Sequence, residues 1–346
     1  MDPIAALERI VHCLDRAHDG THRTRAFVRA LDVARATPPA ELRARAAAET
    51  LADLPGNGAV SARVITEALA GEVPSYLANL EQETVLPMSP AAAELRGRLR
   101  GDLHSHTRWS DGGATLDRMV RTAQELGHEY LVVTDHSPRL TVAHGLDRER
   151  LEQQLAEIAA LQATLDAEAA AGGAGDHERF RILTGMEVDI NEDGTLDLDD
   201  DLLARLDVVV ASVHSKLRMA AGPMTERMVL AVASPHVDVL GHCTGRLLGK
   251  RPESAFDADY VFAACAQLGT AVEINSRPER MDPPDHLLAV ARDHGCLFAI
   301  DSDAHATGQL EWQPHGCEKA VVAGVPAERI VNTWTAERLL AWTGGR

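Results

Sequence analysis

The stretch Asp102-Leu103-His104-Ser105-His106 predicts the first strand of a β-sheet, with two histidines on one of its faces. In a strand, residues i and i+2 point to the same side, so His104 and His106 can face one metal ion together. Asp111 follows in the turn-like segment Trp109-Ser110-Asp111-Gly112, which can bring a carboxylate back to the same place. A His-x-His pair alone is a weak signal, because alternating polar residues also suit a half-exposed strand.

Strands and helices alternate from this stretch to the end of the chain. We expect strands at 102–106, 130–134, 181–188, 208–213, 237–240, 271–274 and 296–300, and helices near 116–126, 148–170, 228–233, 260–267, 287–293 and within 327–343. The segment Gly172-Gly173-Ala174-Gly175 is expected to be the loop that ends the second of these helices. Parallel strands need crossover connections, so the alternation predicts a parallel sheet, and seven or eight such units tend to close into a barrel.

Residues 1–100 differ from the rest in pattern and in charge. Residues 1–84 have apolar residues at helical spacing near 4–14, 25–35, 41–52 and 60–69, and residues 85–100 are expected to be a linker to the domain at 101–346. The first 100 residues hold 12 arginines and 13 acidic residues, a formal charge of −1, whereas the whole chain carries −18. The acidity is therefore concentrated in the alternating region, and it repels nucleic acid at long range.

The composition favours a water-soluble α/β protein. Of the 346 residues, 45% are hydrophobic but only 3% are aromatic, so the core must be mainly aliphatic. The five cysteines are odd in number and lack C-x-x-C spacing, which argues against a secreted disulfide framework. No signal peptide and no membrane-spanning run is visible, so we expect a cytoplasmic protein without a membrane partner.

Polar residues follow every predicted strand at its carboxyl end, which is the functional face of α/β barrels. The candidate metal ligands at these ends are His104, His106, Asp111, His136, Glu187, His214, His242, Asp303 and His305. Nitrogen and oxygen ligands without thiolates suit Zn, Mn or Fe, and nine candidates are too many for one ion. Two or three ions bridged by a carboxylate fit better, and such a cluster can activate water and clamp a phosphoryl group.

Taken singly, each of these residues has a plainer reading as a hydrogen-bonded or exposed side chain. Asp189 and Asp193 are open to both readings, although Asn191-Glu192-Asp193-Gly194 favours a turn. Chance is a poor explanation for the recurrence of such residues at the ends of successive predicted strands.

The set resembles the polymerase and histidinol phosphatase (PHP) superfamily. The matching segments are Asp102-Leu103-His104-Ser105-His106, Ser110-Asp111-Gly112, Val133-Thr134-Asp135-His136-Ser137, Gly185-Met186-Glu187, Ser212-Val213-His214, Gly241-His242 and Asp301-Ser302-Asp303-Ala304-His305. The resemblance covers residues 101 to about 340. Two further segments, Ser212-Val213-His214-Ser215-Lys216 and Thr244-Gly245-Arg246-Leu247-Leu248, are similar to the PHP module of bacterial family X DNA polymerases.

This resemblance implies a distorted (βα)7 barrel with three divalent ions. It implies that His104, His106, Glu187 and Asp303 hold the first ion, that Glu187 bridges to a second held by His214 and His242, and that Asp111, His136 and His305 hold the third. Glu187, His136 and Asp111 are the residues we expect to matter most in catalysis. Lys216, Arg246 and Arg277, each just past a strand end, are candidate phosphate contacts; surface charge is an equally good reading of them.

The helical region resembles, more weakly, the small domain that begins family X polymerases. Leu54-Pro55-Gly56-Asn57-Gly58 looks like a helix–hairpin–helix, a motif whose backbone N–H groups bind DNA phosphates. Asn57 stands where the motif usually has an aliphatic residue, and no lysine in residues 1–100 can form a Schiff base. A helical cap without DNA-binding function is the alternative. No polymerase catalytic domain fits between the two regions.

The sequence thus predicts a metal-dependent phosphoesterase, with two competing substrates. One is a DNA 3′ end, cut by a 3′–5′ exonuclease or 3′-phosphatase as in DNA repair. The other is a small phosphomonoester such as histidinol phosphate or a nucleotide, which the acidity and the scarcity of aromatic residues favour. A non-catalytic metal- or DNA-binding module is the alternative of another class.

Overall fold

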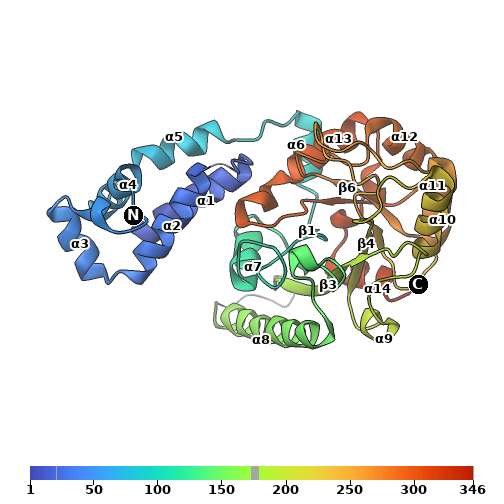
Figure 1. Ribbon diagram of the computed structural model, residues 1–346, viewed down its shortest axis with the longest axis horizontal. Coiled ribbons are helices and arrows are strands. Elements are labelled where there is room, and N and C mark those ends of the chain that lie inside the picture. The colour runs from blue at the N-terminus through green and yellow to red at the C-terminus, as the bar shows by residue number, and fades with distance from the viewer. Residues whose placement is uncertain (21, 173–178, 346) are drawn as a thin grey trace. The chain divides into compact units, whose positions relative to one another are not determined.

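Seven parallel strands form one sheet, in which each strand pairs with the next along the chain (Figure 1). They are β1 (Gly101–Asp102), β2 (Tyr130–Val133), β3 (Arg181–Asp189), β4 (Val208–Ser212), β5 (Val239–Leu240), β6 (Ala271–Asn275) and β7 (Phe298–Asp301). A parallel bridge between Ser105 and Ala304 joins the chain after β1 to the chain after β7. The sheet therefore nearly closes, and the predicted distorted barrel of seven βα units is confirmed.

The structure, a computed structural model, describes residues 1–20, 22–172 and 179–345. Contacts divide the chain into two compact units, Met1–Pro87 and Met88–Arg346. Of the loop expected at residues 172–175, residues 173–175 lie outside the described part. No helix in the described ranges is long and apolar enough to cross a membrane.

The first strand is much shorter than the predicted one at 102–106. Beyond Asp102 two backbone N–H groups find side-chain acceptors instead of a neighbouring strand: Leu103 N donates to Asp301 Oδ1 and Ser105 N to Thr134 Oγ1, both at 2.9 Å. Because these acceptors satisfy the backbone, the chain leaves the ladder while staying in place. The histidine pair is therefore held on a rigid loop rather than on a strand.

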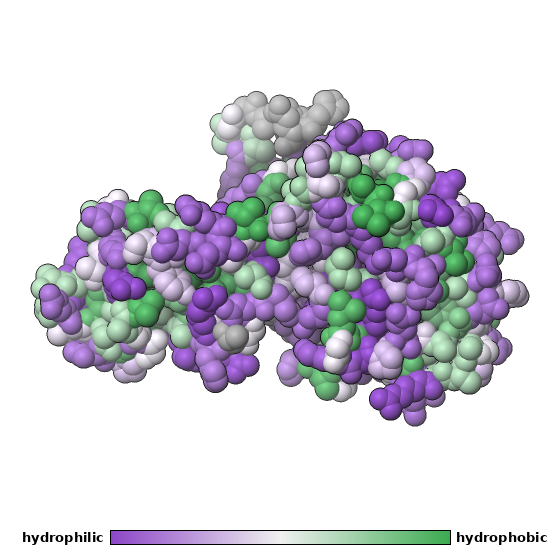
Figure 2. All heavy atoms as spheres, turned by 90° about the horizontal axis from the view of Figure 1, so that it is seen from above, coloured by the Kyte–Doolittle hydropathy of each residue, from purple (hydrophilic) through white to green (hydrophobic). Residues whose placement is uncertain are grey.

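Helices surround the sheet on its outer side (Figure 1). In the barrel unit they are α6 (Pro90–Arg96), α7 (Leu116–Glu125), α8 (Arg148–Gly172), α9 (Asp200–Leu203), α10 (Ala221–Val232), α11 (Ala258–Leu268), α12 (Asp285–Asp293), α13 (Gln313–Val322) and α14 (Ala336–Thr343). Buried Val, Leu, Ile and Met residues from the strands and helices form the core between the layers, as the composition predicts. On the face drawn in Figure 2 hydrophilic residues cover most of the surface, with hydrophobic ones interspersed.

The expected linker at 85–100 contains helix α6. The Ser89 side chain caps this helix by accepting from Ala92 N, and Ala92, Leu95 and Leu99 belong to the barrel's main core cluster. Helix α6 packs against α13, which the sequence pattern also missed. Arginines alternate with these apolar residues, so the buried stripe becomes apparent only once its packing partner is known.

The smaller unit consists of α1 (Pro3–Arg16), α2 (His22–Ala36), α3 (Pro39–Ala47), α4 (Ala59–Leu69) and α5 (Ser75–Glu83). Its own core includes Leu7, Ile10 and Phe27. In the turn before α4, Gly56 has a φ of +93°, which glycine adopts without strain. The Asn57 side chain is buried and donates to Leu51 O at 3.0 Å, so this polar residue occupies an inward position through a hydrogen bond.

Candidate metal centre

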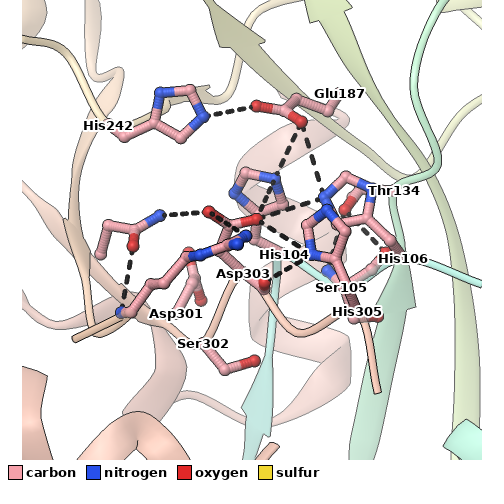
Figure 3. A network of polar contacts seen from close by, with 12 residues as sticks. His104, Ser105, His106, Thr134, Glu187, His242, Asp301, Ser302, Asp303 and His305 are labelled. Atoms are coloured by element: carbon pink, nitrogen blue, oxygen red, sulfur yellow. Dashed lines mark hydrogen bonds and ion pairs between the residues drawn. The ribbon is translucent and has the colours of Figure 1, made fainter. Parts of the chain in front are cut away.

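The nine candidate ligands lie together at the carboxyl ends of the strands. Glu187 is in β3 itself, and the others lie in the loops that follow β1, β2, β4, β5 and β7. His104, His106, Glu187, His242, Asp303 and His305 point toward a common centre (Figure 3). Strand ends far apart in sequence therefore supply one site.

Glu187 lies at the middle of this centre and is only 1% exposed. Its Oε1 is 2.8 Å from His242 Nε2 and 3.3 Å from His214 Nε2. Its Oε2 is 2.9 Å from His136 Nδ1, 3.3 Å from His104 Nε2 and 3.5 Å from His106 Nε2. One carboxylate thus faces five imidazole rings, as a bridging ligand would.

Two further carboxylates flank Glu187. Asp303 Oδ1 is 3.4 Å from His106 Nε2, and Asp111 Oδ1 is 3.5 Å from His136 Nε2 and 3.4 Å from His305 Nε2. Three groups have ligand atoms close enough for one ion each: His106–Asp111–His136–His305, His104–His106–Asp303 and His136–Glu187–His214. The groups share His106 and His136, so the geometry supports a multinuclear arrangement more directly than three separate sites.

Many ligand atoms of the centre are buried without a hydrogen-bond partner among the described residues. They are His104 Nε2, both ring nitrogens of His106 and of His242, His136 Nδ1, both carboxylate oxygens of Glu187 and His214 Nε2. Buried polar atoms without partners are costly and rare, and each calls for a compensating ligand. Imidazole nitrogens and carboxylate oxygens fit Zn, Mn or Fe, so the residues present fit the expected ions.

Three of the histidines do have a partner for the outer ring nitrogen. His104 Nδ1 lies 2.6 Å from Glu273 Oε1, His214 Nδ1 lies 2.5 Å from Asp189 Oδ1, and His305 Nδ1 lies 2.8 Å from the backbone oxygen of Asp303. Such contacts orient a ring so that its other nitrogen faces a metal. The sequence did not assign this role to Glu273. Asp189, two residues after Glu187 on the same face of β3, was predicted only as a ligand or part of a turn.

The charges of the centre are strongly coupled. Burial alone raises the pKa of Glu187, but His104, His214 and His136 outweigh it and hold that pKa well below its usual value. Burial alone lowers the pKa of His214, but Glu187 and Asp189 outweigh it and raise that pKa to about 9. For His106, burial and then His305 and His136 lower the pKa well below its usual value. Without bound ions, the protein thus places several imidazole rings around one carboxylate, and these rings cannot all be protonated at once.

Asp135 holds the loop that carries Asp111 through several hydrogen bonds. The Asp135 carboxylate accepts from Thr107 N at 2.8 Å, from Thr107 Oγ1 at 2.7 Å and from Gln154 Nε2 at 2.6 Å, and also from the Ser110 backbone and hydroxyl. Asp135 is fully buried, whereas the side chain of Asp111 is 35% exposed. Asp111 therefore stands at the open side of the centre.

The predicted phosphate contacts lie in different surroundings. Arg277 Nη1 is 3.9 Å from Asp303 Oδ2, so this side chain borders the centre. Arg246 donates from Nε to Arg280 O at 2.8 Å and from another nitrogen to Met281 O, which engages it in holding a loop. Lys216 is exposed. All three remain predictions.

Arg280 is a basic residue at the centre that the sequence did not single out. Its Nε is 3.0 Å from Asp303 Oδ2, its side chain is 13% exposed, and its buried Nη1 has no hydrogen-bond partner among the described residues. In the sequence, Arg280 differs from Arg277 only in lying five residues past Asn275, the last residue of β6. A basic residue in the loop after β6 was therefore the only signal that could have identified Arg280, and that signal is not specific.

Comparisons with known proteins agree with this geometry. A family model of the PHP domain matches residues 102–277. The DNA polymerase/3'-5' exonuclease PolX of Bacillus subtilis is 38% identical over 236 residues, which are 68% of this chain but only 39% of that protein. A probable phosphatase of a Thermoanaerobacter species is 26% identical over 244 residues, 67% of this chain and 89% of that protein.

Solved structures also show similarity. The histidinol phosphate phosphatase of Lactococcus lactis, solved with zinc, L-histidinol and phosphate, aligns with a TM-score of 0.45 and 18% identity. The alignment covers 65% of this chain and 94% of that one.

Proposed function

The chain belongs to the PHP domain family, and from this premise we propose that it is a metal-dependent phosphoesterase with three divalent ions. The observation that carries the proposal is Glu187, a buried carboxylate whose two oxygens face five imidazoles without one hydrogen bond among the described residues. A structural acid would be expected to have donors from the chain, as Asp135 has. The Glu187 oxygens instead match the needs of bridged cations.

We assign the ligands as the sequence predicted, with Glu187 as the bridge. When bound, divalent ions at such a centre activate water and neutralise the charge that develops on phosphate. His104 and His214 are oriented for this by Glu273 and Asp189. Asp111, on the open side, and the buried His136 beside it are placed to hold a proton or a ligand near the entering substrate.

Two arginines are positioned to orient a phosphate at the centre. Arg280 and Arg277 both approach Asp303 Oδ2, at 3.0 and 3.9 Å. Their remaining guanidinium nitrogens can grip phosphate oxygens, because the planar fork of arginine matches phosphate geometry. In this role they fix the scissile phosphate while the ligands above hold the ions.

For the substrate we favour the end of a DNA strand, processed as a 3′–5′ exonuclease or a 3′-phosphatase. The relative that supports it is a polymerase with a named 3'-5' exonuclease activity, of which this chain matches 39%. In the smaller unit, the turn at Gly56 lies against Arg29, whose Cβ is 3.8 Å from the position of a Cβ on Gly56. An exposed arginine beside this turn suits a DNA phosphate.

A small phosphomonoester is the second candidate, supported by the similarity to probable phosphatases along almost their whole length. Net charge also favours it, since a chain with a formal charge of −18 repels a polyanion at long range. Labelled single-stranded DNA and histidinol phosphate, offered to the same preparation, separate the two. Deletion of residues 1–84 tests whether the helical region contributes to DNA cleavage.

The test of the proposed function is p-nitrophenyl phosphate hydrolysis by protein loaded with Mn or Zn. Glu187→Gln keeps the volume of the side chain but removes its charge, and we expect kcat to fall by roughly 10³-fold or more with loss of bound metal. His136→Ala should lose activity while the fold remains, as circular dichroism would show. If the loaded wild type turns over no phosphoester, the chain is a non-catalytic module and the proposal is wrong.

A further inference from the structure

A cavity of about 560 Å³ lies at the amino end of the barrel, and we call it the amino-end cavity. Its lining includes Arg100 and Glu129, which directly precede β1 and β2, and Arg179 and Arg181 at the start of β3. Thr335, which precedes α14, completes one side of it. The candidate metal ligands lie toward the opposite ends of the strands, so this cavity is separate from the metal centre.

Backbone hydrogen bonds hold the lining of the amino-end cavity together. Glu129 N donates to Arg100 O at 2.6 Å, and Arg181 N donates to Glu129 O at 2.9 Å. Arg100 N donates to Asn332 O at 2.7 Å, which ties the chain just before α14 to the start of β1. The cavity is therefore built on ordered backbone from four separate segments.

The amino-end cavity carries positive charge in a strongly acidic chain. Three arginines and two glutamates line it, whereas the whole chain has a formal charge of −18. Arg100 is paired with Glu129, but the exposed Arg181 side chain has no hydrogen bond or ion pair among the described residues. The start of α14 adds to this charge, because the first N–H groups of a helix have no intrahelical acceptor.

His128 lines the same cavity and brings a buried donor to it. The ring is 5% exposed, and its Nε2 lies 3.0 Å from Arg96 Nη2. Because a guanidinium group only donates, Nε2 accepts, and the proton of the neutral ring is on Nδ1. Burial, and then Arg96, lower the pKa of His128, which keeps the ring neutral.

The Nδ1 atom of His128 is buried and has no hydrogen-bond partner among the described residues. A buried donor without an acceptor is costly, and native proteins contain few of them. An acceptor atom bound in the amino-end cavity would remove that cost. The unused donor, the Arg181 guanidinium and the start of α14 therefore all call for the same kind of ligand, an anion with several oxygens.

We propose that the amino-end cavity binds the phosphate group of a small phosphorylated molecule. The free oxygens of a phosphate point in different directions, so they can accept from Arg181, from His128 Nδ1 and from the first N–H groups of α14 together. A carboxylate has only two oxygens, which lie in one plane. Pockets that hold small organic ligands measure roughly 300–1,000 Å³, so a sugar phosphate or a mononucleotide suits this volume better than a free ion.

A ligand in this cavity lies at the far ends of the strands that carry the metal centre, so it is not the molecule that the centre would hydrolyse. It is instead a ligand that stabilises or regulates the barrel. The inference does not rest on the proposed function, because the residues that carry it lie outside the metal centre.

Calorimetric titration of the metal-loaded full chain with phenylphosphonate tests the site. This probe has a phosphorus–carbon bond in place of the ester bond, so a phosphoesterase does not consume it. We expect Arg181→Gln to weaken the binding of one phenylphosphonate molecule about tenfold. Arg181→Lys keeps the charge but loses the planar fork, and it should weaken this binding about threefold.

Arg205→Gln is the matched control, because it removes a 49% exposed arginine that lies just before β4, at the same end of the barrel but outside the cavity. It should change the affinity for phenylphosphonate less than about twofold. An equal loss in Arg205→Gln and Arg181→Gln would show that only the general charge attracts the probe, and the site would be rejected. Benzoate that binds as tightly as phenylphosphonate would overturn the assignment to phosphate.

Glu187→Gln separates this site from the metal centre. Any phenylphosphonate held by metal ions should be lost in this variant, whereas the binding that depends on Arg181 should remain. If Glu187→Gln abolishes all binding of phenylphosphonate, or if Arg181→Gln changes none of it, the inference is wrong. Neither result depends on whether the wild type hydrolyses a phosphoester.

The ring proton of His128 gives a second readout by proton NMR. Its signal is assigned by its absence in His128→Gln, and it should shift when phenylphosphonate is added to the wild type. The same shift is expected in Glu187→Gln, and a much smaller one in Arg181→Gln at the same concentration of the probe. An unchanged signal in wild type saturated with phenylphosphonate would contradict a phosphate bound at His128.

Discussion

Two kinds of buried acidic residue lie at the carboxyl end of the barrel, and they satisfy their oxygens in opposite ways; we name them the upper layer (Glu187) and the lower layer (Asp135 and Asp282) by this contrast and not by depth. In the upper layer, both oxygens of Glu187 lack hydrogen bonds among the described residues, although five imidazoles surround them. In the lower layer, Asp135 and Asp282 accept from backbone N–H groups and from threonine hydroxyls. The chain thus satisfies the lower layer by itself and leaves the upper layer to a ligand.

This is the difference we expect between residues that hold the fold and residues that hold ions. Burial raises the pKa of Asp135, and donors from Ser110 and Thr107 offset part of that rise. For Glu187 the opposing groups are imidazoles, which are themselves ligands for cations. Mutations in the lower layer should therefore cost stability whether or not metal is present, and mutations in the upper layer should matter mainly through metal.

Asp135→Asn gives the largest expected loss of stability. In the wild type, both carboxylate oxygens of Asp135 accept hydrogen bonds from buried donors. In Asp135→Asn an NH₂ group replaces one of these oxygens, so at least one buried donor loses its acceptor. We expect the free energy of unfolding to fall by about 3 kcal/mol, with or without Mn. All four tryptophans lie in the barrel unit, so their fluorescence during urea unfolding measures this unit.

Asp199→Asn is the control, because its side chain is 72% exposed and pairs with Arg148. It should change stability by less than about 0.5 kcal/mol. If Asp135→Asn lowers the free energy of unfolding only in the presence of metal, Asp135 belongs with the upper layer. The distinction between acids that hold the fold and acids that hold ions would then be wrong.

Glu273→Gln tests the connection between the layers and should have a moderate effect. Glu273 is fully buried. Its carboxylate accepts a hydrogen bond from His242 N at 2.5 Å, in addition to its contact with His104 Nδ1. Loss of its charge weakens the contact that orients His104, so metal affinity should fall about 10–100-fold. Titration against a competing chelator measures this, and kcat at saturating metal should fall much less.

Asp189→Asn makes the same change at His214 and serves as the matched comparison. The two variants should weaken metal binding to a similar degree. Unchanged affinity in both would show that these acids only fill space, and the orienting role would be rejected.

Strand order and strand ends could be predicted from the sequence, because both follow from local patterns. Alternating apolar runs and helices predicted the seven parallel strands, and the residues after each run were brought together at one end. The length of the first strand was wrong, since the pattern at 102–106 gave no sign that Asp301 and Thr134 would capture its N–H groups. Those acceptors come from distant segments.

Contacts between distant segments also explain which residues the sequence-based prediction of the site missed. The sequence pattern identified each histidine at a strand end as a separate candidate ligand. The resemblance to a family then grouped these candidates into ligand sets. Glu273 and Arg280 were indistinguishable in sequence from any other acid or base after β6. Their roles depend on contacts with His104 and Asp303, which only folding creates.

Histidines extend the comparison to the amino end of the barrel, where the smallest effect is expected. His128, just before β2, is 5% exposed, and its Nε2 lies 3.0 Å from Arg96 Nη2. Burial, and then Arg96, lower its pKa to about 3, whereas an unfolded chain gives about 6.5. The native chain therefore binds fewer protons than the unfolded chain between these values, and stability falls as pH drops below about 6.5.

His128→Gln should remove this dependence, because glutamine accepts from Arg96 but does not titrate. Between pH 7.5 and pH 5 the wild type should lose about 2 kcal/mol more than the variant, by urea unfolding followed through tryptophan fluorescence. Val142→Thr, at a residue that is 86% exposed and does not titrate, should keep the wild-type slope. Since the histidines of the metal centre titrate equally in all three proteins, the difference isolates His128. An identical slope in His128→Gln would show that this histidine does not stay neutral in the fold.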